Sequence, residues 1–158
     1  MPIVSIQKIK SNCPPGSRLI GIDLGSKTIG LSLSDAGLMI ASPYRTLAKG
    51  KFTKDAGILK NIISREGVGG LILGLPLNMD GAEGPRCQAT RQFADNLLNV
   101  AHLEINIAFW DERLSTSVIN RMLVDQIDMT RGRRAEVVDK LAATYILQGA
   151  LDYKPAPA

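Results

Sequence analysis

The sequence predicts an α/β fold in which a mixed β-sheet carries helices on both faces. Two short apolar runs, at residues 19–22 and 29–33, flank a tight turn and predict a pair of neighbouring strands. Further along the chain, helix-like and strand-like stretches alternate, which is typical of parallel strands joined by helices. A length of 158 residues with 45% apolar residues fits one domain with a substantial core.

The expected elements follow from periodicity and from turn-forming residues. Residues 1–17 hold three prolines and no clear period, so we expect a loosely attached N-terminal arm, followed by a domain at 18–152 and a tail at 153–158. Pro43 would either place the third strand at an edge of the sheet or break it. Strands are expected at 19–22, 29–33, 38–47, 68–75 and 105–110, and helices at about 53–65, at 85–100, after Ser115 or Thr116, and at about 134–151.

Composition narrows the possible functions. The 19 basic and 15 acidic residues give a net charge of +4, a mild preference for polyanionic partners. Cys13 and Cys87 lack the spacing of a zinc site, and His102 is the only histidine, which argues against His-dependent triads and His-rich metal sites. Neither a secretory leader nor 18 consecutive apolar residues occurs, so we expect a cytoplasmic protein without a membrane partner.

Three acidic positions are candidates for chemistry. Asp23 and the pair Asp111-Glu112 follow strands at their carboxyl ends, and Asp139 lies at the edge of the apolar stripe of the last helix. Each acid alone has an ordinary structural explanation, as a turn, helix-dipole or solvated residue. Together, converging carboxylates would require divalent cations, and oxygen ligands favour Mg²⁺ or Mn²⁺, the ions of two-metal phosphodiester hydrolysis.

Basic side chains accompany these acids along the chain. Aromatic residues make up only 4% of the sequence, so we expect contacts to the nucleic-acid backbone rather than stacking on bases. The arginines at residues 131–134 could equally well belong to a loop that only increases solubility and does not bind nucleic acid. The candidate nucleic-acid-binding residues are Lys27, Arg86, Arg113, Arg133, Arg134 and Lys140.

Four ordered motifs resemble the YqgF (RuvX) family. They are Gly21-Ile22-Asp23-Leu24-Gly25 with Ile29-Gly30 and Ser34-Asp35, Gly74-Leu75-Pro76-Leu77-Asn78 with Asp80-Gly81 and Gly84-Pro85, Asp111-Glu112-Arg113-Leu114-Ser115-Thr116, and Val138-Asp139-Lys140-Leu141-Ala142-Ala143. The resemblance implies a ribonuclease-H-like fold and a nuclease that matures the 5′ end of precursor small-subunit rRNA. It also implies that Asp23, Glu112 and Asp139 are the catalytic, metal-binding acids, while Asp111 and Glu112 cannot be separated by sequence.

Other functions remain open at this stage. The family resembles RuvC, so a Holliday junction resolvase acting on four-way DNA is one alternative, and a homodimer rather than a monomer would suit it. A non-catalytic RNA-binding ribosome-assembly factor is another. The turn after Asp23 also resembles the phosphate loop of actin- and sugar-kinase-like ATPases, although one domain is too short to close over a nucleotide in their manner.

Overall fold

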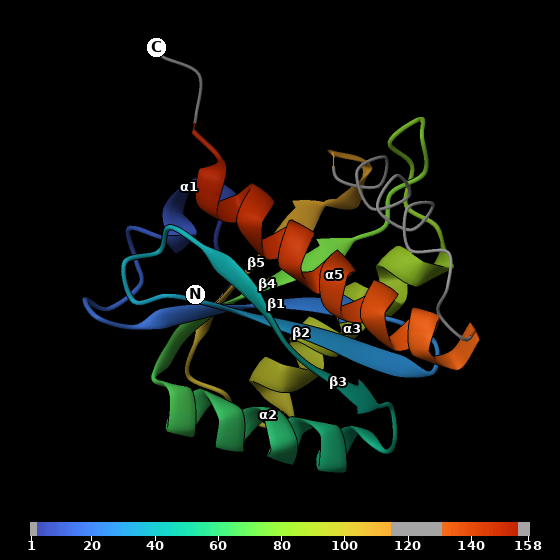
Figure 1. Ribbon diagram of the computed structural model, residues 1–158, viewed down its shortest axis with the longest axis horizontal. Helices are drawn as coiled ribbons and strands as arrows, with labels where there is room; N and C mark the ends of the chain where they lie inside the picture. The colour runs from blue at the N-terminus through green and yellow to red at the C-terminus, as the bar shows by residue number, and fades with distance from the viewer. Residues whose placement is uncertain (1–2, 115–130, 155–158) are drawn as a thin grey trace.

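Five strands form one mixed sheet in the order β3-β2-β1-β4-β5 (Figure 1). The computed structural model describes residues 3–114 and 131–154, with only the backbone at 114 and 131–140. The β1–β2 and β2–β3 pairs are antiparallel, and the β1–β4 and β4–β5 pairs are parallel. The strands are β1 (Arg18–Leu24), β2 (Thr28–Ser34), β3 (Ala41–Ala48), β4 (Val68–Leu75) and β5 (Asn106–Asp111).

Helices cover both faces of this sheet, as the sequence predicted. Figure 1 shows α5 on one face and α2 and α3 on the other. The helical segments are α1 (Ile6–Ile9), α2 (Phe52–Glu66), α3 (Pro85–Asn99), a 3₁₀ turn η1 (Glu112–Leu114) and α5 (Arg131–Asp152). Along the residues that the structure describes, no helix is long and apolar enough to cross a membrane.

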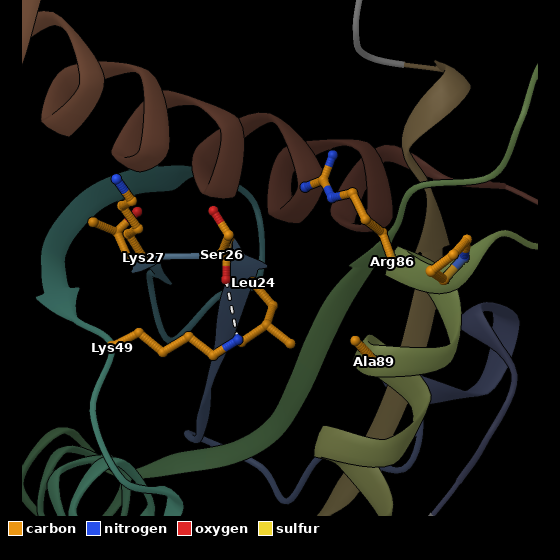
Figure 2. A pocket seen from close by; sticks show the side chains of 9 residues that line it. Leu24, Ser26, Lys27, Lys49, Arg86 and Ala89 are labelled. Atoms are coloured by element: carbon orange, nitrogen blue, oxygen red, sulfur yellow. Dashed lines mark hydrogen bonds between the residues drawn. The ribbon is translucent and has the colours of Figure 1, made fainter.

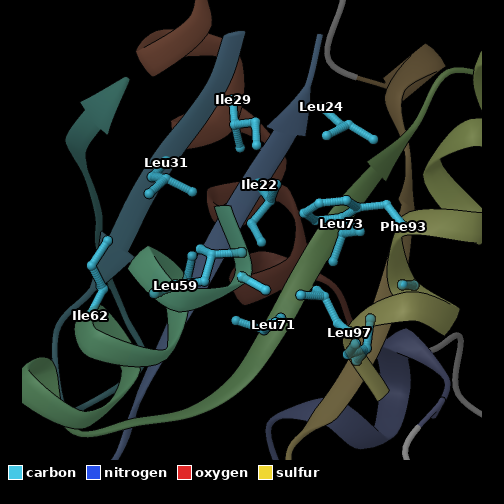
Figure 3. Packing of buried hydrophobic residues seen from close by; sticks show 14 of the residues in the cluster. Ile22, Leu24, Ile29, Leu31, Leu59, Ile62, Leu71, Leu73, Phe93 and Leu97 are labelled. Atoms are coloured by element: carbon cyan, nitrogen blue, oxygen red, sulfur yellow. The ribbon is translucent and has the colours of Figure 1, made fainter. Parts of the chain in front are cut away.

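The larger core lies between the sheet and helices α2 and α3. Alternate residues of the central strands, such as Ile22 and Leu73, pack against Leu59 and Leu97 from the helices (Figure 3). Because side chains alternate across a strand, the residues between them face α5. On β1 this second set includes Gly21 and, two residues later, Asp23.

Helix α5 approaches the sheet closely. Gly21 makes this possible, since a Cβ there would lie 2.6 Å from the carbonyl oxygen of Ala143 and 2.7 Å from Cβ of Leu147. The buried Ser32 hydroxyl donates a 2.6 Å hydrogen bond to the same Ala143 carbonyl. A side-chain hydrogen bond and a close backbone contact therefore fix the height of α5 over β1.

The structure corrects several details of the sequence analysis. Residues 38–40 belong to the β2–β3 turn, because the Asp35 carboxylate accepts hydrogen bonds from the amides of Met39 and Ile40. Strand β3 therefore begins at residue 41, and its edge position agrees with Pro43. The last helix begins at residue 131 rather than 134. The helix expected after Ser115 lies outside the described residues.

The N-terminal arm is packed rather than loosely attached, so that expectation is wrong. The Val4 amide donates to the Ile107 carbonyl at 2.9 Å, and Ile3 forms a parallel bridge with the same residue. A second, smaller core lies between the sheet and the C-terminal part of α5, and Ile9 is fully buried in it beside Leu19 and Ile72. The arm is attached through one strand-like contact and one buried apolar side chain. Neither produces a periodic pattern, so the proline-containing segment gave no sign of the attachment in the sequence.

Candidate active site

Two of the predicted acids meet across the sheet. Asp23 is the penultimate residue of β1, and Glu112 follows the last residue of β5. Strand β4 lies between them, and Gly74 leaves the space for their approach. A Cβ on Gly74 would lie 2.8 Å from Oε1 and 3.0 Å from Cδ of Glu112. The Glu112 side chain therefore lies over the bare backbone of β4, and its carboxyl is hydrogen-bonded to that of Asp23.

The pairing changes the protonation of Glu112. Burial, followed by the charge of Asp23 and the hydrogen bond to Asp23, raises the pKa of Glu112 to about 7, and burial is the largest of these causes. The positive charge of Arg86 acts in the opposite direction. Near neutral pH, two carboxyls held this closely thus share a proton unless another positive charge takes its place.

Asp111 has a different role from its neighbour. Its carboxylate accepts hydrogen bonds from the Arg113 guanidinium, with an Nη2–Oδ2 distance of 2.6 Å, and from the Arg113 amide at 3.0 Å. The side-chain hydrogen bonds from Arg113 are the main cause that lowers the pKa of Asp111. The two adjacent acids are therefore distinguishable in the structure: Arg113 engages Asp111, and Glu112 contacts Asp23.

The backbone of α5 brings Asp139 toward the same end of the sheet. Gln148 accepts a hydrogen bond from the amide of Ala41, next to the β2–β3 turn, and Ala143 lies over Gly21. As residue numbers fall, α5 therefore runs from that turn toward the carboxyl end of β1. Asp139 is one helical turn beyond Ala143 in that direction. Its side chain lies outside the described part of the chain.

The predicted basic residues divide into three groups. Lys27 and Arg86 line a cleft of about 910 Å³ at the end of β1 (Figure 2). Arg113 donates hydrogen bonds to the Asp111 carboxylate and to the Met79 carbonyl, and it does not line the cleft. The side chains of Arg133, Arg134 and Lys140 lie outside the described residues.

Sequence reasoning missed Gly74 as a determinant of the site, and it missed Lys49. Lys49 lines the same cleft and donates from Nζ to the Gly25 carbonyl at 3.2 Å. It follows a strand in a loop of ordinary composition, so no local pattern singles it out. Gly74 stood in a recognised motif, but its role depends on β4 lying between β1 and β5.

The donor set suits a hard divalent cation. Two carboxyls compete for one proton at Asp23 and Glu112, and a cation would relieve their repulsion while using oxygen ligands only. Among the residues whose side chains are described, no group of three His, Cys, Asp or Glu residues could hold a metal. A complete three-acid site would therefore depend on Asp139.

The chain is similar to a known protein family over most of its length. Residues 17–153 match the model of the family described as "RuvX: Holliday junction resolvase". The chain belongs to the RuvX family. A RuvX relative from Phenylobacterium zucineum is 53% identical over 152 residues, covering 96% of this chain and 97% of the relative, and is named "Putative pre-16S rRNA nuclease". A relative from Paramagnetospirillum magneticum has the same name, with 54% identity and 96% coverage of both chains.

Solved structures support the fold of this RuvX chain. RuvC of T. thermophilus, in complex with a Holliday junction substrate, aligns with a TM-score of 0.54 at 12% identity over 85% of this chain and 93% of RuvC. The yeast mitochondrial Holliday junction resolvase Ydc2 aligns with a TM-score of 0.50 at 11% identity over 92% and 82% of the two chains. These similarities confirm the ribonuclease-H-like fold expected from the sequence, and the matching family model confirms the family resemblance.

Proposed function

We propose that this chain is a metal-dependent nuclease that cuts within nucleic-acid strands and matures the 5′ end of precursor small-subunit rRNA. The observation that carries the proposal is the contact between Asp23 and Glu112, which come from distant parts of the chain and meet at the carboxyl edge of the sheet. The names of the relatives at 53–54% identity support rRNA as the substrate.

Asp23, Glu112 and Asp139 would hold Mg²⁺ or Mn²⁺. When bound, such an ion supplies Lewis-acid stabilisation of the reacting phosphate and activation of water. Glu112 has to release its proton before its carboxylate can act as a ligand, so the affinity of the site for the ion should rise with pH up to about 7 and level off above it.

Basic residues at the same edge would orient the substrate. Arg86 lines the cleft next to the acid pair, and its positive charge acts to lower the pKa of Glu112, so its guanidinium would attract the phosphates of a bound strand. Lys27 extends this positive surface along the β1–β2 turn, and Arg113, Arg133, Arg134 and Lys140 would add to it. Contacts between basic side chains and phosphates position the backbone of the nucleic acid and do not distinguish one base sequence from another.

A cleavage assay tests this function. Purified protein with Mn²⁺ is incubated with a 5′-extended 16S precursor and, separately, with a four-way DNA junction. We expect cleavage of the precursor by the wild type and none by Asp23→Asn, whose folded state is checked by circular dichroism. Equal cleavage by Asp23→Asn would contradict the catalytic role of this acid.

A Holliday junction resolvase is the second candidate, favoured by the name of the matching family, "RuvX: Holliday junction resolvase". Symmetric cutting of the four-way junction, without cleavage of the precursor, would establish it. Binding of the precursor without any cleavage, unchanged when all three acids become amides, would instead indicate an RNA-binding assembly factor.

A further inference from the structure

The cleft beside the acid pair has a strongly positive lining. Its wall begins at Leu24, the residue after Asp23, and none of its lining residues in the described part of the chain is acidic. Three cations reach it from three segments: Lys27 from the β1–β2 turn, Lys49 from the end of β3, and Arg86 from the start of α3. Figure 2 shows Arg86 on one side of the cleft and the two lysines on the other.

Lys49 is held in place by its surroundings. Its amide donates to the Lys27 carbonyl at 2.9 Å, and its ammonium donates to the Gly25 carbonyl at 3.2 Å. The next residue, Gly50, donates its amide to the buried carboxylate of Asp55 at 3.1 Å. An ammonium carries three N–H donors, so the contact with Gly25 leaves capacity for an anion in the cleft.

The start of α3 adds to the positive potential. This helix has 15 residues, begins at Pro85 in the cleft wall, and has no acidic residue in its first turn. Its N-cap residue, Gly84, provides no side-chain hydrogen bond to the first amides. The partial positive charge of the helix end therefore adds to that of Arg86, on the side of the cleft opposite the lysines.

We propose that Lys49, together with Lys27 and Arg86, binds a backbone phosphate adjacent to the one hydrolysed at Asp23 and Glu112. The proposal rests on the proposed nuclease function and adds a specific phosphate subsite with a third cation. Arg86 is shared by the phosphate subsite and the acid pair, because it lines the cleft and also acts electrostatically on Glu112. No aromatic side chain is among the described lining residues, so the subsite recognises phosphate rather than base.

The test compares two substitutions that remove one positive charge each. Lys49→Gln keeps an amide donor for the Gly25 carbonyl, and Lys60→Gln changes an exposed lysine on α2 as the matched control. Binding of a short fluorescein-labelled single-stranded RNA is measured by anisotropy in EDTA over a range of salt concentrations. For Lys49→Gln we expect weaker binding and a salt dependence, log K against log[salt], shallower by about 0.7, as for the loss of one phosphate contact. Lys60→Gln should retain the wild-type slope.

The outcomes separate this proposal from the nuclease function. Identical slopes for the two variants, in a protein that cleaves the precursor with Mn²⁺, would overturn the subsite and leave the nuclease function intact. A reduced slope for Lys49→Gln in a protein that does not cleave would support a phosphate cleft and contradict the nuclease function. Displacement of the RNA by ATP at equal phosphate concentration would overturn the assignment to a nucleic-acid backbone.

Discussion

Replacing Glu112 by glutamine should stabilise the metal-free protein above neutral pH. In the folded chain the pKa of Glu112 is raised to about 7 from an ordinary value of 4.5, mainly by burial and then by Asp23. Between these two values the folded state holds a proton that the unfolded state has released. The contribution of protonated Glu112 to the free energy of unfolding is therefore fully present below about pH 4.5 and is lost as the pH rises through about 7.

The size of the effect follows from the shift. At about 1.36 kcal/mol per pKa unit, the change from 4.5 to about 7 corresponds to an upper value of about 3 kcal/mol in the free energy of unfolding. Glutamine does not titrate and resembles the protonated acid in shape. We expect Glu112→Gln and the wild type to be similar near pH 4.5, with the variant more stable by up to about 3 kcal/mol at pH 8.

Urea unfolding, followed by the fluorescence of the single tryptophan, Trp110, measures this difference from pH 4.5 to 8 in EDTA. Glu104→Gln is the control, since it removes a carboxyl from an exposed position before β5. Parallel pH profiles for Glu112→Gln and the wild type would refute the reasoning, because they would show that Glu112 is not confined against Asp23. Added Mg²⁺ should stabilise the wild type at pH 8 more than the variant, since a cation replaces the lost proton.

Three further substitutions probe the geometry of the site and its support. Gly74→Ala places a methyl group against the Glu112 carboxyl and against the side chain of Ile146 on α5, so Mn²⁺-dependent cleavage should fall by about 10²-fold with little change in precursor binding; an unchanged rate would contradict the packing of Glu112 over β4. Gly21→Ala forces α5 away from β1 and should lower the free energy of unfolding by about 1–3 kcal/mol in urea titrations, whereas wild-type stability would show that α5 is free to shift. Arg113→Gln removes the hydrogen bonds that lower the pKa of Asp111, so that pKa should rise in an NMR titration, and a static value would exclude this pairing.

Much of the architecture could be predicted from local patterns. Short apolar runs predicted β1 and β2, and Pro43 was compatible with an edge strand. Gly67 follows the last residue of α2 with a φ of 65°, a conformation that glycine adopts readily, so the end of that helix was also visible in the sequence. These features depend on residues close together in the chain, which is why sequence reasoning found them.

The detailed composition of the site depends on distant contacts. Asp111 and Glu112 are adjacent acids in one motif, and only the position of β4 beside β5 shows that Glu112 reaches Asp23 while Arg113 engages Asp111. Lys49 enters the cleft because β3 returns beside the β1–β2 turn. The packing of the N-terminal arm is another contact of this kind. No periodicity within a short window encodes such placements.

Binding of Mn²⁺ to the metal-free protein tests the central claim most directly, namely that acids from distant segments form one cation site. Isothermal titration calorimetry at pH 8 compares the wild type with Asp23→Asn and Asp139→Asn, using Asp95→Asn on the exposed surface of α3 as the control. We expect Asp23→Asn and Asp139→Asn each to weaken Mn²⁺ binding by at least about tenfold, while Asp95→Asn binds like the wild type. Wild-type affinity in both Asp23→Asn and Asp139→Asn would contradict a shared site.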